Sequence, residues 1–119
     1  MRFVAIALLT CTFLLAAETW KGKWSSDNSG NAGEIRFVLE TGPNVVFTVG
    51  DQEVKTTNVT VKADGTELEI AYDFEIQGYR LRSTVKGTLK EGKLSGKYTT
   101  RSLEDGSSVD SGTVTASQH

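Results

Sequence analysis

Tight turns that contain glycine divide the chain from Trp20 onward into short runs in which apolar and polar residues alternate. Alternation of this kind is typical of β-strands with one buried face, and no stretch shows the spacing of a helix of three turns. A two-residue turn also fixes which residues face each other across the two strands that it joins. The sequence therefore predicts an all-β fold whose strand pairs follow from the positions of its turns.

The turn at Gln77-Gly78 predicts the clearest register. The expected pairs are Glu75 with Arg80, Asp73 with Arg82, Glu69 with Lys86, Phe74 with Leu81, and Ile70 with Val85. Opposite charges fall on one face and apolar residues on the other, and each such pair stabilises a sheet by about 0.2–1 kcal/mol. Because a slip of one residue would destroy this separation, the pairing of the two strands is strongly specified.

The same reasoning at the other turns extends the sheet in both directions. The remaining turns are the 27–33 loop, Thr41-Gly42-Pro43, Gly50-Asp51, Asp64-Gly65, Glu91-Gly92 and Asp105-Gly106, so that seven turns connect eight strands. The predicted pairs are Phe37 with Phe47, Phe47 with Val54, Val61 with Leu68, Val85 with Tyr98, Gly87 with Gly96, Leu89 with Leu94, and Arg101 with Asp110. The result is an up-and-down antiparallel meander.

One change of phase lies inside the fourth predicted strand. The upstream pairs point Val54 inward, whereas the downstream pairs point Val59 inward, so an extra residue is needed near Thr57-Asn58. A β-bulge supplies such a residue, and bulges occur where a sheet bends sharply. A second shift near Gly112 would turn Val114 inward.

A meander with one apolar face must cover that face, and the sequence offers no helix to do so. Closure into a barrel is therefore expected. Eight strands enclose an interior that side chains fill or that holds one small ligand. We expect residues 18–119 to form a single eight-stranded antiparallel β-barrel domain.

The first seventeen residues have the order of a secretory signal peptide. Arg2 precedes an apolar run that ends in Ala16 and Ala17, and this run is shorter than the about 20 residues that a membrane helix needs. Cleavage after Ala17, or alternatively after Ala16, predicts a secreted or periplasmic protein. A membrane anchor and lipid attachment at Cys11 are the two other interpretations of this segment.

Cleavage would also remove Cys11, the single cysteine, so the mature domain could form no disulfide. The whole chain has a formal net charge of −2, and loss of Arg2 makes the mature chain one unit more negative. This balance offers no general electrostatic basis for binding nucleic acid or an anionic membrane.

The first strand, Thr19-Trp20-Lys21-Gly22-Lys23-Trp24-Ser25-Ser26-Asp27, contains a Gly-x-Trp motif. A Gly-x-Trp in the opening strand of an eight-stranded meander resembles the calycin group, which includes the lipocalins and avidins. The resemblance implies a barrel in which Trp24 plugs one end. In avidins an Asn two residues past this Trp and a Ser at the end of the following turn contact biotin, whereas Ser26 and Gly30 occupy those places here, so biotin recognition does not carry over.

Secreted bacterial metalloprotease inhibitors are also small eight-stranded barrels with a Gly-x-Trp near the start. They insert an N-terminal arm into the protease and carry a disulfide. Here the first strand begins almost at the predicted cleavage site and no cysteine remains after it. Both departures count against inhibition.

Catalysis by a nucleophile or a general acid–base pair usually needs a titratable group held against an orienting partner. The single histidine, His119, is the last residue, and nearly every carboxylate falls in a turn or on the outward face of the deduced pairing. No His, Cys, Asp or Glu cluster has metal-ligand spacing. We therefore expect a protein that is not an enzyme and that uses neither a metal nor a cofactor.

The predicted registers place a row of hydroxyl-bearing residues on the inward face: Thr57, Tyr72, Ser83, Thr100 and Ser111. Gly87 and Gly96 face each other beside this row and leave space there. With Trp24 and Tyr98, the row forms a candidate ligand site, because a few polar groups in an apolar pocket are typical of small-molecule binding. Alternatively, the hydroxyls bond one another or trapped water, and the glycines only allow the strands to coil tightly.

The outward face carries a basic strip on two adjacent strands, composed of Arg80, Arg82, Lys86, Lys90, Lys93, Lys97 and Arg101. A solvated exterior explains it as well as a docking surface does, because Glu69, Asp73 and Glu75 face part of it. Asn58-Val59-Thr60 matches the acceptor pattern for N-glycosylation.

The sequence thus predicts a non-catalytic barrel that binds a small, mostly apolar ligand in its interior. The alternative is a protein-interaction module with a solid core, for example an inhibitor-like protein, that works through its surface or loops. The 27–33 loop could act as a lid in the first case or as a contact loop in the second.

Overall fold

The computed structural model describes residues 19–39 and 42–118. The predicted signal peptide (1–17), with Cys11, and the terminal His119 lie outside the described residues. Within these ranges no helix is long and apolar enough to cross a membrane.

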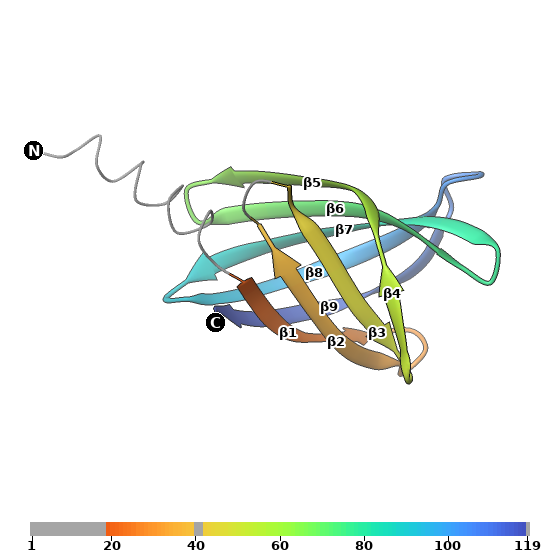
Figure 1. Ribbon diagram of the computed structural model, residues 1–119, viewed down its shortest axis with the longest axis horizontal. Helices are drawn as coiled ribbons and strands as arrows, with labels where there is room; N and C mark the ends of the chain where they lie inside the picture. The colour runs from red at the N-terminus through yellow and green to blue at the C-terminus, as the bar shows by residue number, and fades with distance from the viewer. Residues whose placement is uncertain (1–18, 40–41, 119) are drawn as a thin grey trace, which may run out of the picture.

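The described chain is an all-antiparallel up-and-down meander in one curled sheet, which confirms the all-β meander part of the predicted fold (Figure 1). Its strands are β1 (Thr19–Ser26), β2 (Ala32–Val38), β3 (Asn44–Val49), β4 (Gln52–Lys55), β5 (Thr57–Asp64), β6 (Glu67–Ile76), β7 (Tyr79–Lys90), β8 (Lys93–Ser102) and β9 (Ser108–Gln118).

The predicted strand count is wrong by one, because the strand expected after Gly50-Asp51 is divided at Thr56 into β4 and β5. β4 pairs with β3 and β5 pairs with β6, and these two strands form the edges of a sheet with the order β4-β3-β2-β1-β9-β8-β7-β6-β5. The first and last strands pair, as closure requires. The hydrogen-bonded sheet nevertheless has two edges where a closed barrel was expected.

The bend between the two edge strands has the irregularity that the sequence predicts. The register of β5 on β6 shifts between Thr57 and Thr60, and Asn58 has a φ of 53°. Asparagine adopts this left-handed conformation more readily than most residues. The extra residue turns the strand too sharply for it to continue one ladder, so each half pairs with a different neighbour.

The predicted registers at three turns are confirmed. The Gln77-Gly78 turn pairs Glu75 with Arg80 and the other predicted partners of β6 and β7, and the Glu91-Gly92 turn sets Gly87 opposite Gly96. Gln77, Gly78, Glu91 and Gly92 all have positive φ, as two-residue type I′ turns require. Phe47 likewise faces Val54 across the Gly50-Asp51 turn.

Three other predicted registers are wrong. Val61 faces Ile70 and Phe37 faces Val45, which are shifts of two residues that leave the inward faces unchanged. The first shift arises because Gly65, with a φ of 62°, opens a Gly65-Thr66 turn instead of closing an Asp64-Gly65 turn.

The third error moves side chains to the opposite face. Arg101 faces Ser108 instead of Asp110, and the register of β8 on β9 shifts between Thr100 and Arg101, so that Thr100 faces Asp110. The turn is longer than two residues: the Ser102 backbone N–H donates to the Ser107 carbonyl, and Gly106 N–H donates to the Ser102 carbonyl. The predicted inward direction of Val114 is correct, since this residue is buried.

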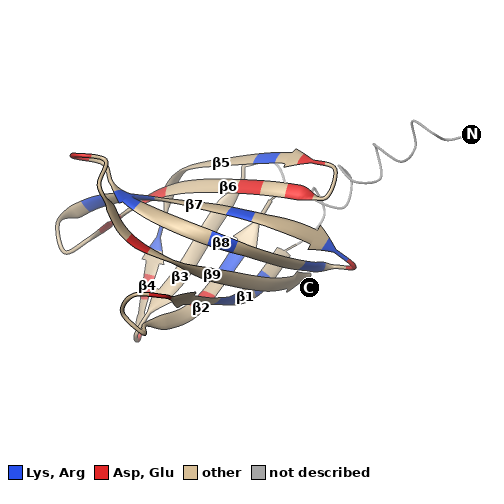
Figure 2. Ribbon diagram, turned by 180° about the vertical axis from the view of Figure 1, so that it is seen from behind, with Lys and Arg blue, Asp and Glu red and all other residues tan. Residues whose placement is uncertain are grey.

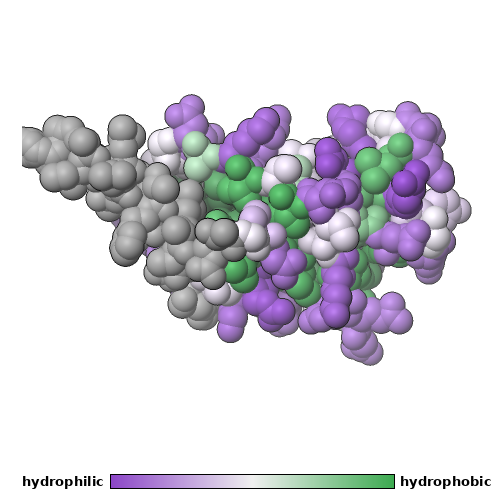
Figure 3. All heavy atoms as spheres, turned by 45° about the horizontal axis from the view of Figure 1, so that its top comes forward, coloured by the Kyte–Doolittle hydropathy of each residue, from purple (hydrophilic) through white to green (hydrophobic). Residues whose placement is uncertain are grey.

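The core fills the half of the curled sheet that contains the beginning of β1. Its most completely buried side chains are Phe37, Val45, Ile70, Val85, Leu94 and Val114. Figure 3 brings β5 toward the viewer and shows apolar side chains between the polar ones on the β5 side of the molecule. The other half, toward the turns after β1, β3, β6 and β8, is less completely filled and contains a pocket.

Candidate functional site

An apolar pocket of about 260 Å³ lies inside the curled sheet, next to the turns that follow β1, β3, β6 and β8. Five aromatic residues line it: Trp24, Phe47, Tyr72, Phe74 and Tyr98. Ile35, Val49, Ile76, Leu81 and Val109 add aliphatic surface. Alternate residues of these strands face the inside of the curled sheet. Near the strand ends, beyond the packed core, these side chains do not fill the space that the sheet encloses, and a pocket results.

Edge-to-face contacts link four of the five aromatic residues. Phe47 and Phe74 have ring centroids 4.9 Å apart at 82°, and Trp24 contacts Phe47 at 6.3 Å and Tyr98 at 6.1 Å in nearly perpendicular arrangements. Contacts of this geometry stabilise beyond the area that they bury. Packing therefore fixes the positions of these rings, which form the aromatic wall of the pocket.

Trp24 is fixed by a hydrogen bond as well. Its indole N–H donates to the Thr48 carbonyl oxygen at 2.9 Å. Gly33, on the neighbouring strand, leaves room for this contact: a Cβ at Gly33 would overlap the Thr48 carbonyl and lie 2.6 Å from the Trp24 Nε1. The Gly-x-Trp tryptophan thus lines the pocket, and Trp20, at the start of β1, is buried more completely than Trp24.

A pair of buried hydroxyls contributes polar groups to the apolar wall. Ser83 and Thr100 face each other across β7 and β8, and their side-chain oxygens are 2.5 Å apart. Tyr72 lies opposite Ser83 on β6, and burial raises the pKa of its phenol above the usual range. The hydroxyls bond each other, as one of the two predicted alternatives states, and they also line the pocket.

Asp110 is the charged residue of the pocket, and the sequence did not predict it as a site residue. Its Oδ1 accepts a hydrogen bond from the Ser26 hydroxyl at 2.6 Å, and its Oδ2 accepts one from the Tyr98 hydroxyl at 2.8 Å. Burial, followed by the hydrogen bond to Asp110 and its charge, raises the pKa of Tyr98. A one-residue shift between β8 and β9 places this carboxylate on the inner face, and the shift expected near Gly112 is the signal that could have located it.

The Ser26 hydroxyl links the carboxylate to the loop after β1. It accepts hydrogen bonds from the backbone N–H groups of Asn28 and Ser29, at 3.2 and 3.1 Å, while it donates to Asp110. Asn31, at the end of the same loop, lines the pocket. The loop is thereby attached to the mouth of the pocket.

Five of the seven predicted site residues come together in this pocket: Trp24, Tyr72, Ser83, Tyr98 and Thr100. The predicted alignment is wrong for the other two. Thr57 faces Asp73 and is exposed because the bulge starts at this residue. Ser111 faces Thr99 on the outer phase of β9, since Asp110 takes the inner position.

The space expected beside Gly87 and Gly96 is filled. A Cβ at Gly87 would lie 2.9 Å from the Cδ1 atom of Leu94 and 2.8 Å from the Ser95 carbonyl oxygen. These glycines allow the strands and the Leu94 side chain to approach closely. The pocket therefore lies nearer to the turns than the sequence predicts.

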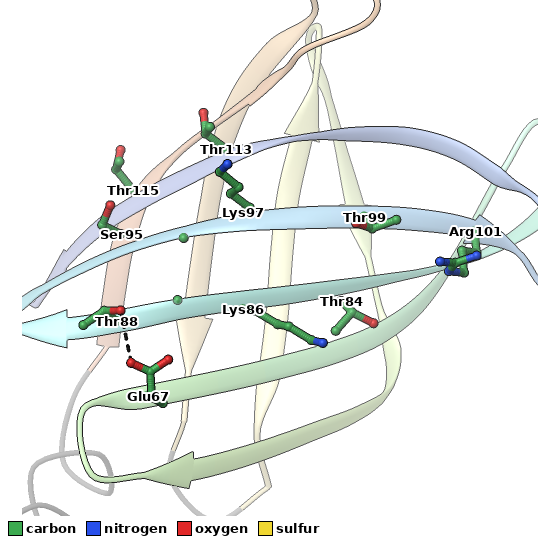
Figure 4. A pocket seen from close by; sticks show the side chains of 12 residues that line it. Glu67, Thr84, Lys86, Thr88, Ser95, Lys97, Thr99, Arg101, Thr113 and Thr115 are labelled. Carbon is green, nitrogen blue, oxygen red and sulfur yellow. Dashed lines mark hydrogen bonds between the residues drawn. The ribbon is translucent and has the colours of Figure 1, made fainter.

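A larger groove of about 890 Å³ crosses the outer face of β6 to β9 (Figure 4). Lys86, Lys97 and Arg101 line it together with threonine and serine hydroxyls. Acidic and basic residues share this side of the molecule (Figure 2), and Asp73 forms a salt bridge with Arg82 at 2.6 Å. Because the groove opens on exposed charged side chains, the aromatic pocket is the better candidate for a small-molecule site.

Across the described ranges, no group of three or more His, Cys, Asp and Glu residues could hold a metal ion. No family model, curated protein or solved structure matches this chain.

Proposed function

We propose that this protein binds a small, mostly apolar molecule, without catalysis, in the aromatic pocket of its curled sheet. The observation that carries the proposal is a pocket with apolar and aromatic walls and few polar groups, which is the usual composition of a small-molecule site. Its volume of about 260 Å³ lies just below the range of drug-sized sites, so the ligand is small.

We propose further that the protein acts outside the cytoplasm and that its curled sheet is of the calycin type. Residues 1–17 support export because a basic start, an apolar run and two alanines follow one another as in signal peptides. The pairing of β1 with β9 and the Gly22-Lys23-Trp24 motif support the comparison with calycins. Amino-terminal sequencing of the protein from its source tests the cleavage after Ala17 or Ala16.

Native mass spectrometry of the protein purified from its own source tests for a bound ligand directly. A titration of the protein and its variants with a fluorescent apolar probe tests whether the binding site is the aromatic pocket. Leu81→Trp adds a bulky side chain at a half-buried position of the pocket wall and should weaken probe binding by about tenfold or more, which corresponds to about 1.4 kcal/mol.

Leu103→Trp is the matched control for this titration. Leu103 is 42% exposed, lies at the same end of the molecule and does not line the pocket. Equal probe affinity in both variants, or the absence of any bound small molecule and any probe binding, would refute the proposed function.

The interaction module remains the second candidate because three apolar residues are exposed near the pocket mouth. Tyr79, Leu103 and Val109 are 63%, 42% and 49% exposed, and they lie beside the turns after β6 and β8. An inhibitor-like function predicts that the protein inhibits a member of a metalloprotease panel and that Tyr79→Ser with Leu103→Ser weakens this inhibition. Lack of inhibition across the panel removes this candidate.

A further inference from the structure

Asp110 is the single charged residue among those that line the aromatic pocket, and no Lys, Arg or His lines it. Among the described residues the salt bridge of the molecule joins Asp73 to Arg82, so Asp110 is not neutralised by a cation of the protein. Asp110 is half-buried, so water still reaches part of its carboxylate, but no cation of the described residues pairs with it, and a partly desolvated carboxylate gains from a cationic partner.

The two hydroxyls that contact Asp110 orient it without neutralising it. Ser26 donates to Oδ1 and Tyr98 donates to Oδ2, which occupies one acceptor site on each oxygen. An ionised carboxylate offers about four such sites, so each oxygen can still accept another donor. Asp110 is therefore a fixed acceptor with free capacity at the wall of the pocket.

The surrounding rings also favour a positive charge. Trp24 is in edge-to-face contact with both Phe47 and Tyr98, and all three line the same pocket as Asp110. Aromatic faces attract organic cations, and the attraction increases when the cation is desolvated. A ligand with a negative charge would instead meet the carboxylate with no compensating cation.

We infer that the ligand is a small organic cation, a protonated primary amine with an apolar or aromatic body. The ammonium group donates to Asp110, and the body lies against the aromatic wall. This inference rests on the proposed function, because it names the class of ligand that the same pocket accepts. The alternative role of Asp110 is to tie the loop after β1 to β9 through Ser26.

Three probes of nearly equal size separate these possibilities by isothermal titration at neutral pH: phenethylamine, phenethyl alcohol and phenylacetate. We expect the amine to bind about tenfold to one-hundredfold more tightly than the alcohol, which is the effect of a hydrogen bond to a charged group. Phenylacetate should bind most weakly of the three.

Asp110→Asn tests the carboxylate while it keeps the size of the side chain. It should lower the affinity for the amine to about that for the alcohol, so that the preference for the amine is lost. Asp105→Asn is the matched control, because Asp105 is exposed on the turn at the same end and bonds to Ser107 instead of the pocket. This control should keep the full preference for the amine.

The outcomes distinguish the proposed pocket from the inferred class of ligand. Equal affinities for amine and alcohol in the unmodified protein, with the apolar fluorescent probe still bound, overturn the amine inference and leave the pocket proposal intact. Loss of alcohol binding together with amine binding in Asp110→Asn shows a structural role for Asp110 and also overturns the inference. Failure of all three compounds and of the fluorescent probe to bind overturns the pocket itself.

Discussion

The hydroxyl pair of Ser83 and Thr100 allows a quantitative test of the interior. The two residues are 3% and 5% exposed, and their oxygens are 2.5 Å apart, so each hydroxyl depends on the other as its partner. Ser83→Ala leaves the Thr100 hydroxyl without this partner, and Thr100→Val does the same to Ser83. A buried polar group that loses its partner destabilises a protein by about 1–3 kcal/mol.

The double variant behaves differently because it removes both polar groups. Replacing both partners by apolar groups of similar shape can be nearly neutral, so Ser83→Ala with Thr100→Val should be less destabilising than the sum of the single changes. We expect a coupling free energy of about 1 kcal/mol or more, within the range found for residues in contact. Urea unfolding of the four proteins at equal pH measures it.

Additive free energies of unfolding, within about 0.3–0.5 kcal/mol, would refute the reasoning. Such a result would mean that water in the pocket replaces the missing partner at no cost. It would also mean that the two hydroxyls are available to a ligand, whereas strong coupling shows that Ser83 and Thr100 mainly satisfy each other.

Three further predictions concern other parts of the sheet. Gly33→Ala should destabilise the protein by about 1–3 kcal/mol in urea unfolding, because its Cβ overlaps the Thr48 carbonyl. The pKa of Tyr98 is raised in the folded state, so above pH about 10 the unfolded state loses the phenol proton before the folded state does. The contribution of Tyr98 to the free energy of unfolding is therefore fully present below pH about 10 and is lost as the pH rises above it. Unfolding measured at a series of alkaline pH values should show this fall, and Tyr98→Phe should reduce it. Arg82→Gln should lower the free energy of unfolding by less than about 1 kcal/mol, because the Arg82 side chain is 44% exposed and its ion pair with Asp73 is screened by water.

The sequence predicts the registers on both sides of β7 because the turns after β6 and β7 have residues with positive φ at both central positions. At such a turn the register follows from the sequence alone, as the Glu75–Arg80 pair shows. The turn near Gly65 could not be located in the same way, because a glycine fits either central position of a two-residue turn. The division at Thr56 escaped prediction since a bulge indicates a bend without saying how sharp it is.

The site was predicted in part for the same reason. Ser83 and Thr100 lie between well-specified turns, and they come together as expected. Asp110 follows a longer turn, where a shift of one residue exchanges the inner and outer faces. The inward direction of Val114 indicates a shift near Gly112, but it does not show that the shift lies before Asp110, because Asp110 and Ser111 are both compatible with an outward position.

The two edges of the sheet affect how this chain behaves at high concentration. An unpaired strand edge can add a strand from another molecule and so begin a fibril. β4 has only four residues, among them the charged Glu53 and Lys55, and β5 is kinked at Asn58. Short length, charge and a kink are the features by which natural sheets resist self-association, so this sheet remains open between β4 and β5 without offering a template for aggregation.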